Sequence, residues 1–198
     1  MMRKVAILIF DDVEVLDFCG PFEVFSLAGR SLSEKPFEVF TVAEKTDPVT
    51  ARNGLSVNAS YTTANCPQAD ILVVPGGMGT RRESNNQPLI DWISQQSANA
   101  ELVMSVCTGA LLLAKAGLLE GLAATTHFGA MDLLRKAAPK TEIQPDKRFV
   151  DNGRVLLSAG ISAGIDLSFH LVVRLLGHDV AVETAHWMEY DWKGSTEK

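Results

Sequence analysis

The sequence predicts an α/β protein with a mostly parallel sheet and helices on both faces. Short apolar runs rich in strand-forming residues, such as KVAILIF at 4–10 and LVMSV at 102–106, alternate with segments of helical periodicity. These runs are continuously apolar, which is typical of strands covered on both faces. Strands that alternate with helices along the chain form parallel sheets.

The expected elements follow in order. After the first strand, residues 22–28 repeat apolar side chains with a helical period, and Pro21 is expected in the first turn of that helix. Asn53-Gly54 predicts a small hairpin, and Asn152-Gly153 predicts a second one within 148–160. The remaining expected strands are 37–44, 70–77, 102–106 and 123–126, and the remaining helices are 88–97, 108–119 (closed by Gly121), 129–137, 163–176 and 179–190.

Length and charge narrow the classes of function. The chain has 198 residues, so a single domain over 1–198 is expected. Its net charge is −6, and its basic dipeptides Arg81-Arg82 and Lys147-Arg148 are isolated, which argues against nucleic-acid binding. The first apolar run is only six residues long before two aspartates, and later apolar stretches are interrupted by charges, so neither a signal peptide nor a membrane span is expected.

Cysteine usage indicates a reducing compartment. The three cysteines, Cys19, Cys66 and Cys107, are an odd number, and no pair has the C-x-x-C spacing. A disulfide framework and a metal site are therefore not expected, and no cofactor is predicted. The chain is expected to be cytoplasmic.

Cys107 is the main candidate for chemistry. Free cysteines are most often small buried core residues, and that interpretation stays open. However, Cys107 lies between a predicted buried strand and a predicted helix, where a sharp turn, the helix dipole and free N–H groups favour a thiolate. The helix dipole is expected to lower its pKa.

Two other strand ends are expected at the same edge of the sheet, where such folds bind ligands. Gly76-Gly77 is either a tight turn or an anion-binding turn whose N–H groups, around Gly77 and Met78, face developing negative charge. Asp17 is either an acid at a helix N-terminus or a general acid whose pKa is raised by burial and a nearby thiolate. His127 is either a base for Cys107 or a structural histidine.

The ordered motifs resemble the ThiJ/PfpI superfamily, the class I glutamine amidotransferase-like group. The motifs are AILIFDDVEVLDFCGPFEVF, DILVVPGGMGT, SVCTGALLLAKAGLLEGLAATTHF and SAGISAGID, which together cover nearly the whole chain. The combination is most similar to the branch that contains isonitrile hydratase and the amidase-like ligand domain of AraC-type regulators. The resemblance implies a flavodoxin-like three-layer sandwich, usually homodimeric.

The resemblance also implies site residues. Cys107 would be the nucleophile and Asp17 its acid partner, with Thr108 and Gly77 in the pocket and the SAGISAG turn nearby. Met78, His127 and Ser162 complete the expected oxyanion and substrate-binding residues. Protease-like members carry histidine directly after the cysteine, and Thr108 stands there instead, which argues against peptidase activity.

The expected function is hydration of an isocyanide to an N-substituted formamide through a Cys107 thioimidate, by a lyase acting on a small electrophilic substrate. Two alternatives stay open: a non-catalytic small-molecule or oxidant sensor, and a glyoxalase-like enzyme that processes aldehydes. AraC-type regulators carry a further helix-turn-helix module of about 100 residues, for which the 198 residues are expected to leave no room.

Overall fold

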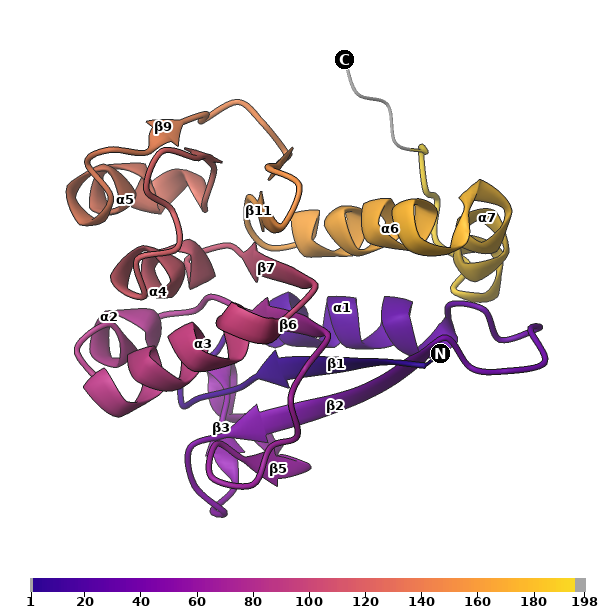
Figure 1. Ribbon diagram of the computed structural model, residues 1–198, viewed down its shortest axis with the longest axis horizontal. Helices are drawn as coiled ribbons and strands as arrows, with labels where there is room; N and C mark the ends of the chain where they lie inside the picture. The colour runs from indigo at the N-terminus through magenta and orange to yellow at the C-terminus, as the bar shows by residue number, and fades with distance from the viewer. Residues whose placement is uncertain (1, 195–198) are drawn as a thin grey trace.

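A seven-stranded sheet runs through the centre of the computed structural model, which describes residues 2–194 (Figure 1). Neighbouring strands are parallel except at one edge, where β10 and β11 form the predicted hairpin. The spatial order is β10 (Phe149–Asp151), β11 (Val155–Ser158), β7 (Leu102–Val106), β6 (Ile71–Val74), β1 (Arg3–Leu8), β2 (Phe37–Ala43) and β5 (Tyr61–Thr62). This is the predicted flavodoxin-like α/β sandwich.

Helices cover the sheet in two groups, with the sheet between them (Figure 1). One group contains α1 (Val15–Leu27), α6 (Ala163–Leu176) and α7 (His178–Trp187), which pack against one another. The other contains α2 (Thr80–Glu83), α3 (Gln87–Asn99), α4 (Gly109–Lys115) and α5 (Met131–Ala137). The central strands β1, β6 and β7 are almost wholly buried, which explains their continuously apolar sequences.

Short elements complete the fold. β3 (Val49–Thr50) and β4 (Ser56–Val57) form the predicted antiparallel hairpin around Asn53-Gly54, with a 3₁₀ turn (Arg52–Gly54) at its tip. β8 (Ala123–Ala124) pairs with β9 (Glu142–Ile143), and a second 3₁₀ turn (Phe128–Ala130) precedes α5. No helix within residues 2–194 combines the length and apolar character needed to cross a bilayer.

The structure corrects the bounds of two helices. α1 begins at Val15, not at 22, so Pro21 lies inside the helix instead of in its first turn. A proline there cannot donate the usual hydrogen bond to the carbonyl of Asp17, yet packing of α1 on α6 keeps the helix intact. α4 ends at Lys115, before the expected residue 119, because Gly117 adopts a left-handed conformation with φ of 74°.

Three elements were not expected from the sequence. They are the one-turn helix α2 and the two-residue strands β5 and β9. Each is too short to show a periodic pattern. The helix α2 matters for function because its first residue, Thr80, contacts the candidate site described below.

Candidate active site

Cys107 occupies a strained turn directly after β7. Its φ is +56°, a left-handed conformation that costs a non-glycine residue about 1–2 kcal/mol. Its neighbours hold this conformation: the Cys107 N–H lies 3.2 Å from the Ser158 carbonyl and 3.3 Å from that of Ala159. The Cys107 carbonyl accepts a 2.7 Å hydrogen bond from Oγ1 of Thr126. Backbone strain of this kind concentrates at functional sites.

Glycines let the neighbouring strand ends approach this turn. A β-carbon on Gly109, the first residue of α4, would lie 2.0 Å from the Val74 carbonyl oxygen at the end of β6. A β-carbon on Gly76 would lie 2.5 Å from the Thr108 nitrogen and 2.9 Å from Oδ2 of Asp17. The sequence predicted a sharp turn between the strand and the helix; in the structure Cys107 itself takes the left-handed conformation, and Gly109 provides room for the backbone of β6.

Asp17, in the first turn of α1, is fully buried beside this turn. Its Oδ2 accepts a 3.1 Å hydrogen bond from the Gly76 N–H. Its Oδ1 is also buried and has no partner of ordinary hydrogen-bond geometry within residues 2–194. The thiol of Cys107 is close enough to shift the pKa of this carboxyl group. The fold thus brings together the two residues that the sequence analysis paired.

Burial dominates the electrostatics of the pair. It raises the pKa of Asp17 to about 7, against the hydrogen bonds from Cys107 and Gly76 that lower it. Burial, followed by the negative charge of Asp17, raises the pKa of Cys107 to about 12, although hydrogen bonds from Thr108 favour the thiolate. The expectation that the helix dipole lowers the thiol pKa is therefore wrong, because desolvation outweighs it. The two groups therefore titrate as a pair, which holds at least one proton at neutral pH.

Thr108 joins the turn after β7 to the turn after β6. Its Oγ1 accepts a 2.9 Å hydrogen bond from the Gly77 N–H and lies 3.1 Å from the Gly77 carbonyl. Oγ1 of Thr80, in α2, lies 3.2 Å from Oγ1 of Thr108 and donates to the Gly77 carbonyl at 2.8 Å. The Gly77 N–H is therefore engaged and cannot serve as the free oxyanion donor that was expected. No acceptor for the N–H of Met78 is found among residues 2–194.

His127 and the sulfur of Cys107 lie against the same residue, Gly160. A β-carbon on Gly160 would lie 3.0 Å from the sulfur of Cys107 and 2.5 Å from Cδ2 of His127, so both side chains abut this glycine. Nδ1 of His127 accepts a 3.1 Å hydrogen bond from the Gly129 N–H, which leaves Nε2 to carry the proton of the neutral ring. The Phe128 ring packs on His127 with centroids 4.4 Å apart and is 84% exposed.

Ser162 lies farther from the reacting groups. It is exposed at the N-terminus of α6, two residues beyond Gly160, and its Oγ accepts a 3.3 Å hydrogen bond from Arg148. Its predicted contact with substrate remains a prediction. The sequence analysis gave no role to Thr80, Thr126 or Gly160, which contact the predicted residues directly. All three lie within the quoted motifs, Thr80 as the last residue of DILVVPGGMGT, but none of them was singled out there.

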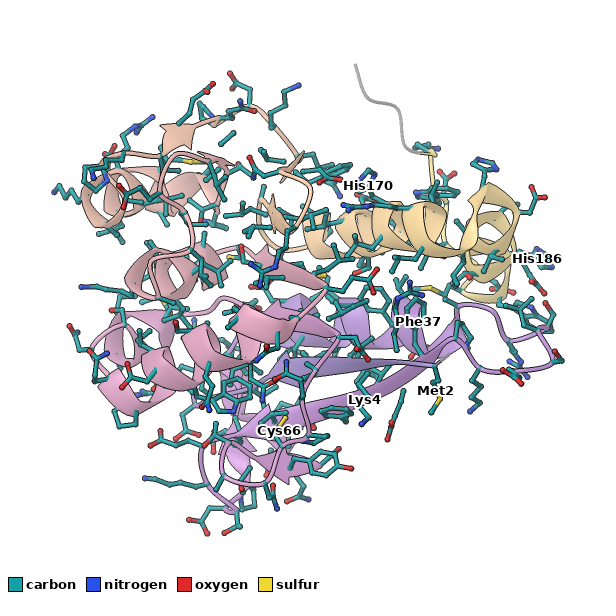
Figure 2. The ribbon with its side chains drawn as sticks, viewed as in Figure 1. Met2, Lys4, Phe37, Cys66, His170 and His186 are labelled. Atoms are coloured by element: carbon teal, nitrogen blue, oxygen red, sulfur yellow. The ribbon has the colours of Figure 1, made fainter. Side chains whose placement is uncertain are left out.

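Other reactive groups lie away from this site. Cys66 follows β5 at the edge of the sheet, and burial raises the pKa of its thiol to about 11 (Figure 2). All three cysteines are free thiols. His170 and His186 lie on the terminal helices (Figure 2). Within residues 2–194, no three histidine, cysteine or carboxylate side chains are arranged to hold a metal ion.

Comparison with known proteins identifies similar sequences and a similar fold. A model of the DJ-1/PfpI family matches residues 3–174. An isonitrile hydratase from Pseudomonas putida is 37% identical over 191 residues, which are 96% of this chain and 79% of that protein. The transcriptional regulator GbdR of Pseudomonas aeruginosa is 23% identical, and this chain matches 51% of its length. A ThiJ/PfpI family crystal structure from Pseudomonas syringae superimposes with a TM-score of 0.88 at 28% identity, over all of this chain and 78% of that one.

Proposed function

The chain belongs to the DJ-1/PfpI family, and from this premise and the buried Asp17–Cys107 pair we propose that it is an isonitrile hydratase-like lyase. The substrate would be a small isocyanide and the product an N-substituted formamide. Two observations support this choice. The carboxyl group of Asp17 and the thiol of Cys107 lie in one buried site and shift each other's pKa, and the isonitrile hydratase of Pseudomonas putida is 37% identical. No cofactor takes part in the proposed reaction.

In the first step, the sulfur of Cys107 attacks the terminal carbon of the isocyanide while its proton passes to the carboxylate of Asp17. One C–N π bond breaks with its electron pair moving to nitrogen, and the lone pair of the attacked carbon takes that proton from Asp17. An S–H bond breaks, S–C and C–H bonds form, and the product is a thioimidate. A pKa of about 7 suits this relay, because Asp17 can accept and return a proton near neutral pH.

In the second step, water adds to the thioimidate carbon. Asp17 accepts a proton from the water and passes it to the substrate nitrogen. Collapse of the adduct forms the C=O bond, breaks the C–S bond and returns a proton to the sulfur. The products are the formamide and the free thiol, so one water is consumed per isocyanide and the enzyme is regenerated.

The limited access to the sulfur of Cys107 favours a narrow electrophilic substrate. Only 5% of the residue is exposed, so a bulky carbonyl compound would have to displace its neighbours. The carbon of an isocyanide is terminal and unhindered, and can approach end-on. Phe128 and Met78, 84% and 54% exposed, each follow a residue that contacts the site and offer apolar surface to the substituent on nitrogen.

The direct test is formamide production from cyclohexyl isocyanide by the wild type and by Cys107→Ala and Asp17→Asn, followed by gas chromatography. We expect no turnover in Cys107→Ala and about 10²–10⁴-fold slower turnover in Asp17→Asn. Absence of turnover in the wild type with several alkyl and aryl isocyanides would refute the proposal.

The two alternatives give different results. Methylglyoxal consumption without isocyanide turnover would assign the glyoxalase-like reaction. An oxidant sensor would add oxygen selectively at Cys107 under mild peroxide, but such sensors rely on thiols of low pKa. Burial raises the pKa of Cys107, which lowers the reactivity of this sulfur toward peroxide and toward an isocyanide alike, so the two assays together separate the sensor from the enzyme. A homodimer and a cytoplasmic location belong to the same proposal, and light scattering after size exclusion tests the former.

A further inference from the structure

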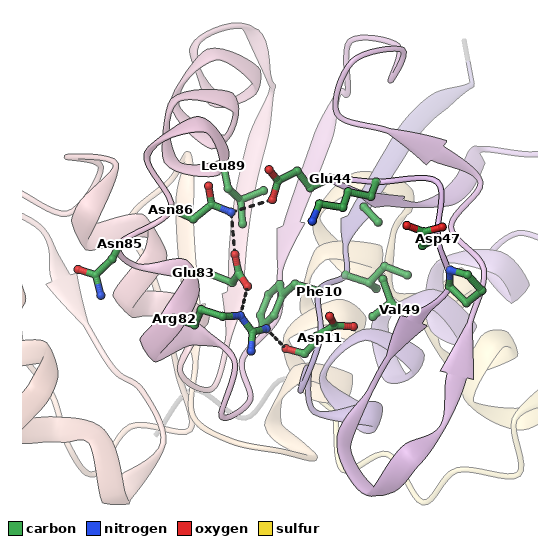
Figure 3. A pocket seen from close by; sticks show the side chains of 14 residues that line it. Phe10, Asp11, Glu44, Asp47, Val49, Arg82, Glu83, Asn85, Asn86 and Leu89 are labelled. Carbon is green, nitrogen blue, oxygen red and sulfur yellow. Dashed lines mark hydrogen bonds and ion pairs between the residues drawn. The ribbon is translucent and has the colours of Figure 1, made fainter.

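A cavity of about 660 Å³ opens at the carboxyl edge of the sheet, apart from the candidate active site (Figure 3). Its walls come from the ends of β1 and β2, the segment 44–49 and the region of α2 and α3. Neither Asp17 nor Cys107 lines it. The volume falls within the range of about 300–1,000 Å³ that is typical of small-molecule sites.

One part of the cavity is apolar. Phe10, Val49 and Leu89 come from three different elements and are almost fully buried in the protein core. Ile9, Ala43 and Pro48 extend this surface. Figure 3 shows Phe10 between the side chains of α2 and α3 and the strand that carries Val49. An apolar group of a ligand would be desolvated here.

The opposite part is a fixed polar wall. Nε of Arg82 donates to Glu83 at 2.8 Å, and Nδ2 of Asn86 donates to the other oxygen of Glu83 at 2.9 Å. The same Asn86 nitrogen donates to Glu44 at 2.7 Å (Figure 3). Nη2 of Arg82 also donates to the Asp11 carbonyl at 2.7 Å. These bonds tie α2 and α3 to the ends of β1 and β2, so the wall is organised without a ligand.

The charges that line the cavity favour a cation. Glu83 is only 7% exposed and is neutralised by Arg82. Beyond that pair, the lining has the three carboxylates of Asp11, Glu44 and Asp47 and one ammonium group, that of Lys45. No three such groups within residues 2–194 are arranged to hold a metal ion.

We propose that this cavity is a second small-molecule site, which binds an organic ammonium ion with an apolar body. The apolar body would lie on Phe10, Val49 and Leu89, and the ammonium group would face Glu44 and Asp47. The proposal is independent of the reaction at Cys107, because it uses different residues and a separate cavity.

The test titrates ¹⁵N-labelled protein at pH 7 with three probes of similar shape and follows the amide shifts by NMR. The probes are 2-phenylethylamine (a cation), 2-phenylethanol (neutral) and 3-phenylpropionate (an anion). We expect saturable shifts at the amides of Val49, Glu83 and Asn86, strongest with the amine. Glu44→Gln combined with Asp47→Asn should weaken the amine about three- to tenfold and leave the alcohol unchanged. Both side chains are exposed, so the fold is expected to persist.

Two controls separate this site from other effects. Glu34→Gln combined with Asp132→Asn removes the same charge from exposed positions that do not line the cavity, and should leave amine binding unchanged. Cys107→Ala should also leave it unchanged. The proposal is overturned by preference for the anion or the alcohol, by absence of shifts at the cavity amides, by unchanged amine affinity in the cavity variant, or by loss of binding in Cys107→Ala.

Discussion

Asp17 and Cys107 meet in one buried site, where burial raises the pKa of each and the carboxylate further raises that of the thiol. Asp17 comes from α1, the helix that follows β1, and Cys107 from the turn after β7, and the strand β6 lies between β1 and β7 in the sheet. Both groups are buried, so water does not stabilise the charged form of either. The shared proton therefore controls both the chemistry and the stability of this site.

The rate of isocyanide hydration should rise with pH around the pKa of Asp17. Below about pH 7 the carboxyl group is protonated and cannot accept the thiol proton. Above it the rate should level off, because the pKa of the thiol is about 12. A profile of kcat/KM from pH 5 to 10 measures this. Asp17→Asn should abolish the inflection, and an inflection that persists in this variant would assign it to another group.

Asp17→Asn should also lower the pKa of the Cys107 thiol. Removal of the negative charge removes one cause of its upward shift and leaves burial as the main one. Thiolate absorbance near 240 nm measures the titration in a Cys19→Ser/Cys66→Ser background, where Cys107 is the one thiol left, and the same titration of a background that also carries Cys107→Ala is subtracted to remove the tyrosine signal. An unchanged or higher thiol pKa would show that the two groups do not interact electrostatically.

The same substitution should stabilise the protein at alkaline pH. The folded-state pKa of Asp17 is about 7, above the ordinary value near 4 of the unfolded chain. The folded protein therefore binds more protons between about pH 4 and 7, and its stability decreases as pH rises through this window. The full shift corresponds to about 4 kcal/mol, so Asp17→Asn should increase the free energy of unfolding at pH 8.5 by a few kcal/mol.

Urea unfolding at pH 4.5 and 8.5 checks this expectation. The gain should largely disappear at pH 4.5, where Asp17 is protonated in the folded state. Asp132→Asn, at a side chain that is 89% exposed, is the control and should change little at either pH. If Asp17→Asn is less stable than the wild type at pH 8.5, Asp17 is not a buried carboxylate whose negative charge destabilises the fold.

The sequence predicted the long, strongly patterned parts of this molecule, but not contacts that depend on close packing. Buried strands such as LVMSV at 102–106 and the two Asn-Gly hairpins have local signals, and the structure confirms them. Asp17 and Cys107 could be paired through family motifs. The raised thiol pKa could not be predicted, because it depends on how completely the fold excludes water. The cavity beside Glu83 had no sequence signal, since its walls come from three separate segments of the chain.

Thr126 should hold the strained turn at Cys107 in its reactive conformation. Its hydroxyl donates a 2.7 Å hydrogen bond to the Cys107 carbonyl, and both groups are buried. Thr126→Val keeps the side-chain shape and leaves that carbonyl without this partner, which should cost about 1–3 kcal/mol. If this bond positions the sulfur, alkylation of Cys107 by iodoacetamide and isocyanide turnover should both change.

Thr125→Val is the matched control. Thr125 is equally buried and its hydroxyl donates to the Lys147 carbonyl at 3.2 Å, away from Cys107. Both variants should lose stability in urea unfolding, whereas only Thr126→Val should alter the alkylation rate of Cys107, followed by peptide mass spectrometry. Equal alkylation rates in the two variants would limit Thr126 to a structural role, because a positioning residue must change the reactivity of the sulfur as well as the stability of the fold.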